Sequence, residues 1–208
     1  MKLHDKIVLV TGGSRGIGKA ISKLFVEEGA QVIITSKNIT KLEQTAKEIN
    51  CSFFIGADIK NENDVNNAIK KIIEKFGRID ILVNNAGILP EQKQLDEINE
   101  NDWNEIIDVN LTGQFRFTKC VIPHMKKNGG SIINISSDAG LKAFENFYAD
   151  AYVASKAAMI MLTKSWALQY ASDMIRVNCI CASVVDTDMT NSFWLDSEIT
   201  RKNTSKAH

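Results

Sequence analysis

The sequence predicts an α/β fold in which a doubly wound parallel sheet lies between two layers of helices, giving a three-layer α/β/α single domain. Two observations carry this prediction. Apolar, β-rich runs alternate with helical stretches along the chain, a pattern typical of parallel sheets that are covered on both faces. The length of 208 residues and the hydrophobic content of 44% are those of a globular chain that buries a large core.

The elements are expected in strict alternation. We expect strands at 6–10, 31–35, 52–57, 80–83, 131–135 and 174–180, and helices near 17–28, 39–49, 61–76, 101–127 and 151–172. Right-handed crossovers between parallel strands then predict the strand order 3-2-1-4-5-6. Because ligands bind such sheets at the carboxyl ends of the strands, we expect the functional site at that edge. The sequence has no internal repeat or low-complexity linker, so the predicted domain spans 1–208.

A glycine-rich turn follows the first predicted strand. It reads Thr11-Gly12-Gly13-Ser14-Arg15-Gly16-Ile17-Gly18, and an amphipathic helical stretch comes directly after it. Glycine at 12, 16 and 18 lets the backbone turn tightly and approach a diphosphate, while the helix start offers free N–H groups and a positive dipole end. The spacing is G-x-x-x-G-x-G and not the common G-x-G-x-x-G. This segment predicts a Rossmann-type dinucleotide site, with a purely structural turn as the alternative.

A tyrosine and a lysine lie four residues apart within the last predicted helix. Tyr152 and Lys156 therefore stack on one helix face. A nearby ammonium favours the phenolate, so we expect Lys156 to lower the phenol pKa from about 10 toward the range used in proton transfer. Since the spacing is frequent by chance, an exposed helical pair is the alternative interpretation.

Charge and cysteine content exclude several classes of function. The formal net charge is zero, so we expect no nucleic-acid partner and no anionic membrane partner. The N-terminal residues lead directly into the first strand without a long apolar segment, which predicts no signal peptide, no membrane span and a cytoplasmic location. Cys51, Cys120, Cys179 and Cys181 follow no metal-ligand pattern, so we expect buried free thiols and no metal.

From residue 5 to about 190, the chain resembles the short-chain dehydrogenase/reductase family of nicotinamide-dependent oxidoreductases. Five motifs carry the resemblance in order: Thr11–Gly18, Asn84-Asn85-Ala86-Gly87, Val109-Asn110-Leu111-Thr112-Gly113, Ile135-Ser136-Ser137, and Tyr152 with Lys156. Five motifs in the right order are far more specific than any one of them. The resemblance implies reversible hydride transfer between a nicotinamide and a carbonyl carbon, with the cofactor supplying the hydride.

The resemblance also implies a role for each catalytic residue. Tyr152 would donate a proton to the developing alkoxide, and Lys156 would hold down the phenol pKa and bind the nicotinamide ribose. Ser137 would hydrogen-bond the substrate oxygen. Asn110 would hold a water that links Lys156 to solvent. Ser136 is an alternative to Ser137, but the three residues that follow match the family when Ser137 is the catalytic serine.

The loop after the second strand indicates the cofactor. Ser36 stands where relatives that prefer NAD usually carry an aspartate, and Lys37 and Arg15 supply cations, so NADP (NADPH) is expected and NAD is less favoured. The alternative is that both cations are solvated surface charges. The resemblance implies these cofactor contacts: Gly12, Ser14, Arg15, Gly16, Ile17, Gly18, Ser36, Lys37, Asp58, Ile59, Asn85, Ala86, Gly87, Tyr152, Lys156, Val185 and Thr187. Within this set, Asp58 would accept a hydrogen bond from the adenine amino group.

The chain departs from the family pattern at three places. Ser137 and Tyr152 are two residues farther apart than usual, with the insertion at 147–150, so we expect an enlarged loop over the substrate in which Tyr148 shapes the pocket. Cys181-Ala182-Ser183 stands where relatives carry Pro-Gly. After Thr190 the usual covering segment and seventh strand are missing, so we expect a domain that lacks the family's C-terminal segment, with an exposed edge strand and an open nicotinamide half.

The combined prediction is an NADP(H)-dependent oxidoreductase that transfers a hydride between the nicotinamide and a ketone or secondary alcohol, resembling 3-oxoacyl reductases. The alternative is a catalytically impaired dinucleotide-binding protein or a truncated fragment. The family resemblance also predicts a homodimer or homotetramer built through the last two long helices. Apolar side chains there exceed what one sheet face must cover, so some should face a partner; they are Phe115, Phe117, Met159, Leu162 and Trp166.

Overall fold

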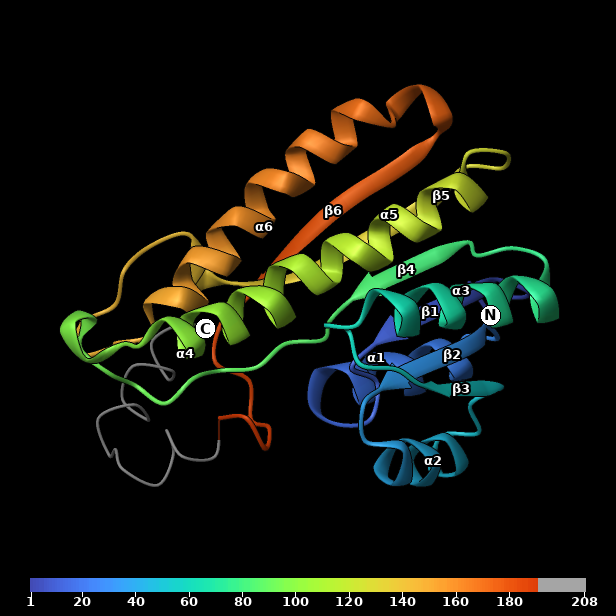
Figure 1. Ribbon diagram of the computed structural model, residues 1–208. Helices are drawn as coiled ribbons and strands as arrows, with labels where there is room; N and C mark the ends of the chain where they lie inside the picture. The colour runs from blue at the N-terminus through green and yellow to red at the C-terminus, as the bar shows by residue number, and fades with distance from the viewer. Residues whose placement is uncertain (191–208) are drawn as a thin grey trace.

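The computed structural model describes residues 1–190, which contain a six-stranded sheet with helices on both of its faces (Figure 1). The strands are β1 (Ile7–Thr11), β2 (Gln31–Ser36), β3 (Phe53–Gly56), β4 (Ile81–Asn84), β5 (Gly130–Ser137) and β6 (Ile175–Ala182). They pair in the order β3-β2-β1-β4-β5-β6, and all five pairs are parallel. The predicted doubly wound topology is therefore confirmed. Within the described residues β6 is an edge strand, and residues 191–208 lie outside them.

Two layers of helices sandwich the sheet. The helices are α1 (Gly16–Glu27), α2 (Ile39–Glu48), α3 (Glu62–Phe76), α4 (Glu100–Ile107), α5 (Gly113–Met125) and α6 (Asp150–Gln169). The helices α1 and α2 cover one face of the sheet, whereas α3, α5 and α6 pack on the other (Figure 1). No helix of residues 1–190 is both long enough and apolar enough to cross a bilayer.

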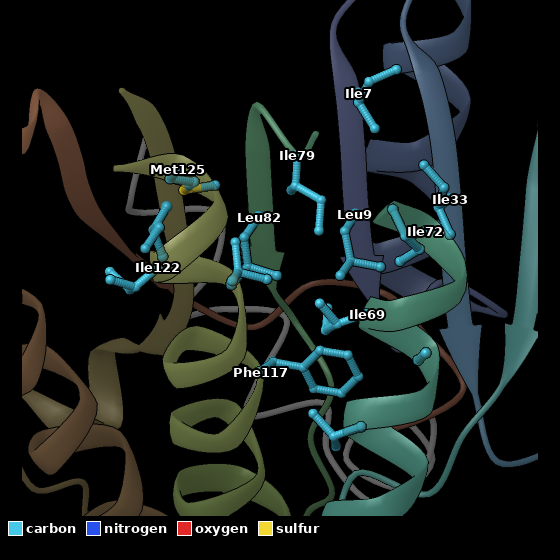
Figure 2. Packing of buried hydrophobic residues seen from close by; sticks show 14 of the residues in the cluster. Ile7, Leu9, Ile33, Ile69, Ile72, Ile79, Leu82, Phe117, Ile122 and Met125 are labelled. Atoms are coloured by element: carbon cyan, nitrogen blue, oxygen red, sulfur yellow. The ribbon is translucent and has the colours of Figure 1, made fainter. Parts of the chain in front are cut away.

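The alternation of side chains along each strand divides the core in two. On β1, Leu9 points toward α3 and α5, and its neighbours Val8 and Val10 point toward α1 and α2. Figure 2 shows the first of these clusters, in which Leu9 and Phe117 lie among the isoleucines of α3. Each large apolar side chain buried in this way contributes about 1.5–3 kcal/mol. This packing holds the carboxyl ends of the strands in place as a fixed platform.

The apolar residues expected at a subunit interface lie mostly in this core. Phe117, Met159 and Trp166 are buried, and Leu162 packs partly buried against them. These four side chains therefore pack toward the sheet, and the prediction that some of the five face a partner depends on Phe115. Phe115 alone of the five is exposed, at 45%.

The predicted helix over 101–127 differs from the structure at its centre. A π-helical turn at Asp108–Thr112 separates α4 from α5. Such a turn accommodates one extra residue per hydrogen-bonded ring and occurs frequently at functional sites. Asn110, one of the predicted catalytic residues, lies in the middle of it and is fully buried.

The cysteines also differ from expectation. Among residues 1–190 all four thiols are free, but each is half-buried and not buried. No group of three or more acidic, histidine or cysteine side chains in the described part of the chain is arranged to hold a metal ion.

Candidate active site

A cleft of about 250 Å³ opens at the carboxyl edge of the sheet. It lies where the loops after β1, β2, β3, β4 and β5 meet the start of α6, as expected for a ligand site in a sheet of this type. Most of the residues singled out from the sequence line it: Gly12, Ser14, Arg15, Gly16, Ile17, Ser36, Lys37, Asp58, Ile59, Asn85, Ala86, Gly87, Ser137, Tyr152, Lys156, Val185 and Thr187. Gly18 and Asn110 lie behind the cleft wall.

The glycine turn has the conformation that its sequence predicted. Gly12 and Gly16 have positive φ angles of 66° and 52°, which side chains other than glycine rarely adopt. Space is also restricted. A Cβ atom at Gly12 would lie 2.8 Å from the Cα atom of Ala86, and one at Gly18 would lie 2.5 Å from the carbonyl oxygen of Gly12. Gly18 therefore acts by letting α1 pack closely beneath the turn.

The start of α1 presents free backbone donors to this turn. Its N-cap residue, Arg15, makes no side-chain hydrogen bond to the first turn, and that turn carries no acidic residue. The first N–H groups of a helix lack intrahelical partners and carry the positive end of the dipole. The helix start is therefore suited to bind an anionic group, such as a diphosphate.

Thr11 joins the glycine turn to the loop after β4. Its Oγ1 atom accepts hydrogen bonds from the backbone N–H groups of Asn85 (3.0 Å) and Ala86 (3.1 Å). In return, Asn85 Nδ2 donates to the carbonyl oxygens of Thr11 (3.0 Å) and Gly12 (3.2 Å). The Asn85 side chain thus positions the turn. Thr11 was not among the predicted site residues, although a polar residue at the buried end of β1 is a usable signal.

Gln114 is a second positioning residue that the sequence reasoning missed. Its Nε2 atom donates to the carbonyl oxygen of Ala86 over 2.6 Å, and the side chain is fully buried at the start of α5. Its Oε1 atom has no hydrogen-bond partner within the described residues. Gln114 holds the loop after β4 from the side opposite to Thr11, and no local sequence pattern marks it.

Hydroxyl groups and cations gather at the end of β2. Ser14 Oγ donates to Ser36 Oγ over 3.2 Å, and both residues line the cleft together with Lys37. Arg15 Nη1 lies 3.9 Å from a carboxylate oxygen of Asp188, beyond β6. This end of the cleft therefore combines neutral hydroxyls with positive charge, and Ser36 occupies the position that the sequence analysis assigned to cofactor choice.

Asp58 and Ile59 follow β3 on the opposite side of the cleft. Asp58 Oδ1 accepts the backbone N–H of Lys60 over 2.9 Å, and its own N–H donates to Asp64 Oδ2 over 3.0 Å. Ile59 packs against α5, since a Cβ atom at Gly113 would overlap its side chain. These contacts give the loop a fixed shape, and within residues 1–190 they leave Asp58 Oδ2 open to a hydrogen-bond donor from a ligand.

Lys156 lies in the floor of the cleft and is 5% exposed. Its Nζ atom donates to the carbonyl oxygen of Ile135 over 2.9 Å. Burial lowers the pKa of Lys156 to about 8, because the surrounding apolar medium penalises the charged form. Ser136 anchors the same helix turn, since its Oγ donates to the backbone oxygen of Lys156 over 2.8 Å. The hydroxyl of Ser136 is thereby occupied. Ser137 is the last residue of β5, and its Oγ donates to Asp138 Oδ1 and accepts the Ala139 N–H, both over 3.2 Å.

Tyr152 lies one turn before Lys156, with the lysine Nζ atom 5.4 Å from the centre of its ring. The expected lowering of its pKa is not found. Burial raises the pKa of Tyr152, a hydrogen bond with Ser137 opposes this effect, and the charge of Asp138 adds to it. The lysine interacts with the ring face and with Ile135, so desolvation of the phenol dominates. Tyr152 therefore keeps its proton at neutral pH.

The buried side chain of Asn110 forms two hydrogen bonds with Ile88. Its Oδ1 accepts the Ile88 N–H over 2.8 Å, and its Nδ2 donates to the Ile88 oxygen over 2.8 Å. A Cβ atom at Gly87 would lie 3.3 Å from Asn110 Oδ1 and 3.7 Å from Lys156 Nζ. Asn110 thus fixes the loop that faces Lys156, while its side chain makes no direct contact with the lysine.

The enlarged loop before α6 lies against Tyr152. The ring of Phe147 meets that of Tyr152 edge to face, with centroids 6.2 Å apart. The backbone of Tyr148 accepts the N–H of Lys93 over 3.1 Å and donates to Gln92 Oε1 over 3.0 Å. Tyr148 is 46% exposed, its hydroxyl contacts Asn146, and it lines a neighbouring cavity together with Ile88 and Lys93.

The segment after β6 forms the remaining wall. Thr187 faces the glycine turn, since a Cβ atom at Gly16 would lie 3.4 Å from its Cγ2 atom. Thr190 Oγ1 donates to the carbonyl oxygen of Val185 over 2.6 Å and holds the segment in a turn. Residues 191–208, where the family's covering segment is expected to be missing, lie outside the described residues.

These features fit a nicotinamide dinucleotide. The glycine turn allows close approach, the uncapped helix start suits a diphosphate, and a buried lysine and tyrosine lie at the opposite end of the same cleft. Gly12, Gly16 and Ile17 would hold the diphosphate, Asp58 the adenine, and Lys156 the nicotinamide ribose. When bound, the cofactor supplies or accepts a hydride.

Comparison with known proteins agrees with this geometry. A family model for short-chain dehydrogenases matches residues 6–198. A 3-oxoacyl-[acyl-carrier-protein] reductase of Thermotoga maritima is 39% identical over 196 residues, covering 91% of this chain and 78% of the relative. An L-fucose dehydrogenase of Bos taurus is 39% identical over 175 residues, covering 84% of this chain. The chain spans 64% of the length of that second relative.

Solved structures show the same likeness. A 3-ketoacyl-(acyl-carrier-protein) reductase of Brucella melitensis, crystallised with NADH, superposes with a TM-score of 0.85 at 32% identity, covering 89% of this chain and 78% of that structure. A short-chain type dehydrogenase/reductase of Mycobacterium marinum gives a TM-score of 0.89 at 30% identity, with 93% and 78% covered. Fold, site geometry and sequence thus agree, and the chain belongs to the short-chain dehydrogenase/reductase family of oxidoreductases.

Proposed function

We propose that this protein transfers a hydride between NADP(H) and a ketone or secondary alcohol. The observation that carries the proposal is the cluster of Ser137, Tyr152 and Lys156 in the cleft that also contains the glycine turn. In the direction of reduction, the carbonyl carbon receives the hydride and its oxygen takes the Tyr152 proton. Both the C–H bond and the O–H bond of the alcohol product are then accounted for.

Each residue of the cluster would contribute to that proton transfer. The raised pKa of Tyr152 keeps the phenol protonated until an alkoxide of higher basicity develops beside it. Ser137, which hydrogen-bonds the phenol, would hold the substrate oxygen at the same place. Lys156, with its pKa lowered to about 8, is able to exchange a proton near neutral pH and would replace the one that Tyr152 gives up.

Asn110 would support this relay from the π-helical turn. With its side chain occupied by Ile88, the residue leaves only its backbone to hold a water. The irregular turn spaces the backbone carbonyls unlike those of an α-helix, which favours such a role. We infer that a water at this turn links Lys156 to solvent.

NADPH is the proposed cofactor form. Ser36 offers a hydroxyl where a carboxylate would repel a phosphate, and Arg15 and Lys37 supply two positive charges at the same end of the cleft. The Brucella melitensis relative was crystallised with NADH, so relatives alone do not determine the choice for this chain. The local charge is the supporting observation.

The proposed substrate is a small or medium-sized carbonyl compound. Relatives named for 3-oxoacyl thioesters, L-fucose and 3β-hydroxysteroids are 36–39% identical, and all three classes contain a ketone or an alcohol that is interconverted. Phe147 lies edge to face against the Tyr152 ring and would contact the substrate body. We propose a 3-oxoacyl thioester as the first candidate, and a cytoplasmic homodimer or homotetramer as the working form.

A non-catalytic dinucleotide-binding protein is the second candidate. Ala182 and Ser183 stand where the family carries Pro-Gly, beside the nicotinamide end of the cleft. Proline and glycine would restrict and shape this loop in ways that alanine and serine do not. A changed loop would affect hydride transfer without affecting the glycine turn.

NADPH oxidation measured with a 3-oxoacyl thioester, a steroid ketone and a cyclic ketone separates the two candidates. Turnover with any of them supports the first, and Tyr152→Phe should reduce it by at least about 100-fold with NADPH affinity unchanged. Tyr170→Phe is the matched control, because it removes a phenol at the opposite end of α6, away from the residues that line the cleft, and should retain activity. NADPH binding without turnover on every ketone selects the second candidate.

A further inference from the structure

One carboxylate lies between two cations at the β2 end of the cleft. Asp188 Oδ2 is 3.2 Å from Lys41 Nζ and 3.9 Å from Arg15 Nη1. The three side chains belong to separate parts of the fold: the segment after β6, the first turn of α2, and the glycine turn. Each is about half exposed, so a ligand is able to reach them from solvent.

The carboxylate occupies the region of the cleft that the proposed function gives to a phosphate. Asp188 lines the same cleft as Ser36, Lys37 and Arg15. Arg15, Lys37 and Lys41 bring three positive charges to this region against the single negative charge of Asp188. Within residues 1–190 no ion pair is recorded for Lys37. A phosphate monoester carries a charge of about −1.5 to −2 at neutral pH and would compete well for these cations.

We propose that Asp188 is an internal anion that occupies the 2′-phosphate subsite, and that Lys41 is a third cation of that subsite. This inference rests on the proposed use of NADP(H). Binding of NADPH exchanges the carboxylate for the phosphate, so the two ion pairs of Asp188 break as those of the phosphate form. NADH carries a hydroxyl at this position and leaves the Asp188 pairs intact.

The exchange has a structural consequence. Asp188 ties the segment after β6 to α2 and to the glycine turn, and Thr187 lies against Gly16 in the same segment. Loss of the two ion pairs of Asp188 removes the first of these contacts and keeps the second, between Thr187 and Gly16. The two cofactors therefore leave this wall of the cleft in different states, tethered with NADH and untethered with NADPH.

The expected effect is modest because the pairs are exposed. Exposed ion pairs contribute at most about 1 kcal/mol each, which corresponds to about a fivefold change in an equilibrium constant. Asp188→Asn removes the charge and retains the shape. It should tighten NADPH binding by about three- to tenfold and change NADH binding by less than about twofold.

The test measures dissociation constants for NADPH, NADH, 2′-AMP and 5′-AMP with the full chain. Asp188→Asn should tighten NADPH and 2′-AMP selectively, and Lys41→Ala should weaken those two selectively. Asp186→Asn is the matched control, because Asp186 is an exposed carboxylate two residues away with no recorded ion pair in the described part of the chain. It should change all four constants by less than about twofold.

Different outcomes would overturn different parts of the account. If Asp188→Asn and Asp186→Asn change the dissociation constants equally, the carboxylates act on the cofactor only through their long-range charge, and the inference is wrong. If the wild-type chain prefers NADPH and Asp188→Asn leaves that preference unchanged, the inference about Asp188 is wrong while the proposed cofactor stands. If the wild-type chain does not prefer NADPH and Asp188→Asn does not create a preference, both the proposed cofactor and the inference about Asp188 are wrong.

Discussion

Replacing the buried Lys156 by methionine should stabilise the protein while it abolishes catalysis. Burial lowers the pKa of Lys156 from its ordinary value of 10.5 to about 8. At 1.36 kcal/mol per unit, the buried charge costs about 3 kcal/mol at pH 7. Methionine removes that cost but leaves the carbonyl of Ile135 without its lysine donor, a loss of about 1 kcal/mol. The free energy of unfolding should therefore rise by about 2 kcal/mol at pH 7.

The pH dependence of this difference is the sharper test. Between pH 8 and 10.5 the unfolded chain binds more protons at Lys156 than the folded chain does, so wild-type stability rises with pH in this window. Below pH 8 both states are protonated, and the cost of the buried charge is present in full. The Lys156→Met variant lacks this titration. Its advantage should be greatest at pH 7, decline above pH 8, vanish at about pH 9.5 and reverse by pH 10.5, where the lost hydrogen bond to Ile135 dominates.

Urea unfolding of both proteins from pH 7 to pH 10.5 measures this difference directly. Lys164→Met, an exposed position two turns along the same helix, is the control and should change stability by less than about 0.5 kcal/mol. A Lys156→Met variant that is less stable than wild type at pH 7 would refute the reasoning. So would an advantage that stays constant across the pH range.

Three further predictions concern binding and assembly. Replacing Arg15 and Lys37 together by alanine should weaken NADPH by at least about tenfold more than NADH in a fluorescence titration, because both cations face the phosphate end; equal losses would refute this role. Gly12→Ala should abolish NADPH binding in the same assay, and retained binding would contradict the account. Gly77→Ala is the control: Gly77 also has a positive φ, but the space around its Cβ position is open, so this variant should lose only about 1 kcal/mol of stability. Phe115→Glu should lower the molecular mass in light scattering if the exposed face of α5 is an interface, and a wild-type monomer at micromolar concentration would exclude the proposed oligomer.

The parts of the fold that local patterns determine were predictable from the sequence. Apolar runs of four to seven residues placed the strand ends to within one position, except that β5 and β6 extend by two residues beyond their predicted carboxyl ends. The glycine turn was predictable because positive φ and close packing both require glycine. The strand order followed from crossover handedness and short connections.

Features that depend on burial were not predictable. The spacing of Tyr152 and Lys156 indicated their proximity, but the direction of the phenol pKa depends on desolvation, which no local pattern reports. The π-helical turn around Asn110 was not predicted, because the sequences before and after it both have the periodicity of an α-helix. Phe117 and Phe115 are two residues apart on one helix, and only packing shows that one is buried and the other exposed.

Contacts between segments that are far apart in the sequence were also not predictable. Asp188 and Lys41 are separated by 147 positions, and neither stands in a motif that indicates the other. Thr11 holds the loop after β4 through two hydrogen bonds, and Gln114, from another element, holds it through one. Such residues share no spacing rule, because the fold alone brings them together.

The most direct test of the central claim is the transfer of an isotope label from cofactor to product. NADPH that carries deuterium on the transferred position at C4 is incubated with the protein and a 3-oxoacyl thioester, and the product is examined by mass spectrometry. The account predicts one deuterium on the former carbonyl carbon with wild type and at least about 100-fold slower transfer with Tyr152→Phe. NADPH that binds tightly but transfers no deuterium to any ketone tested would contradict it.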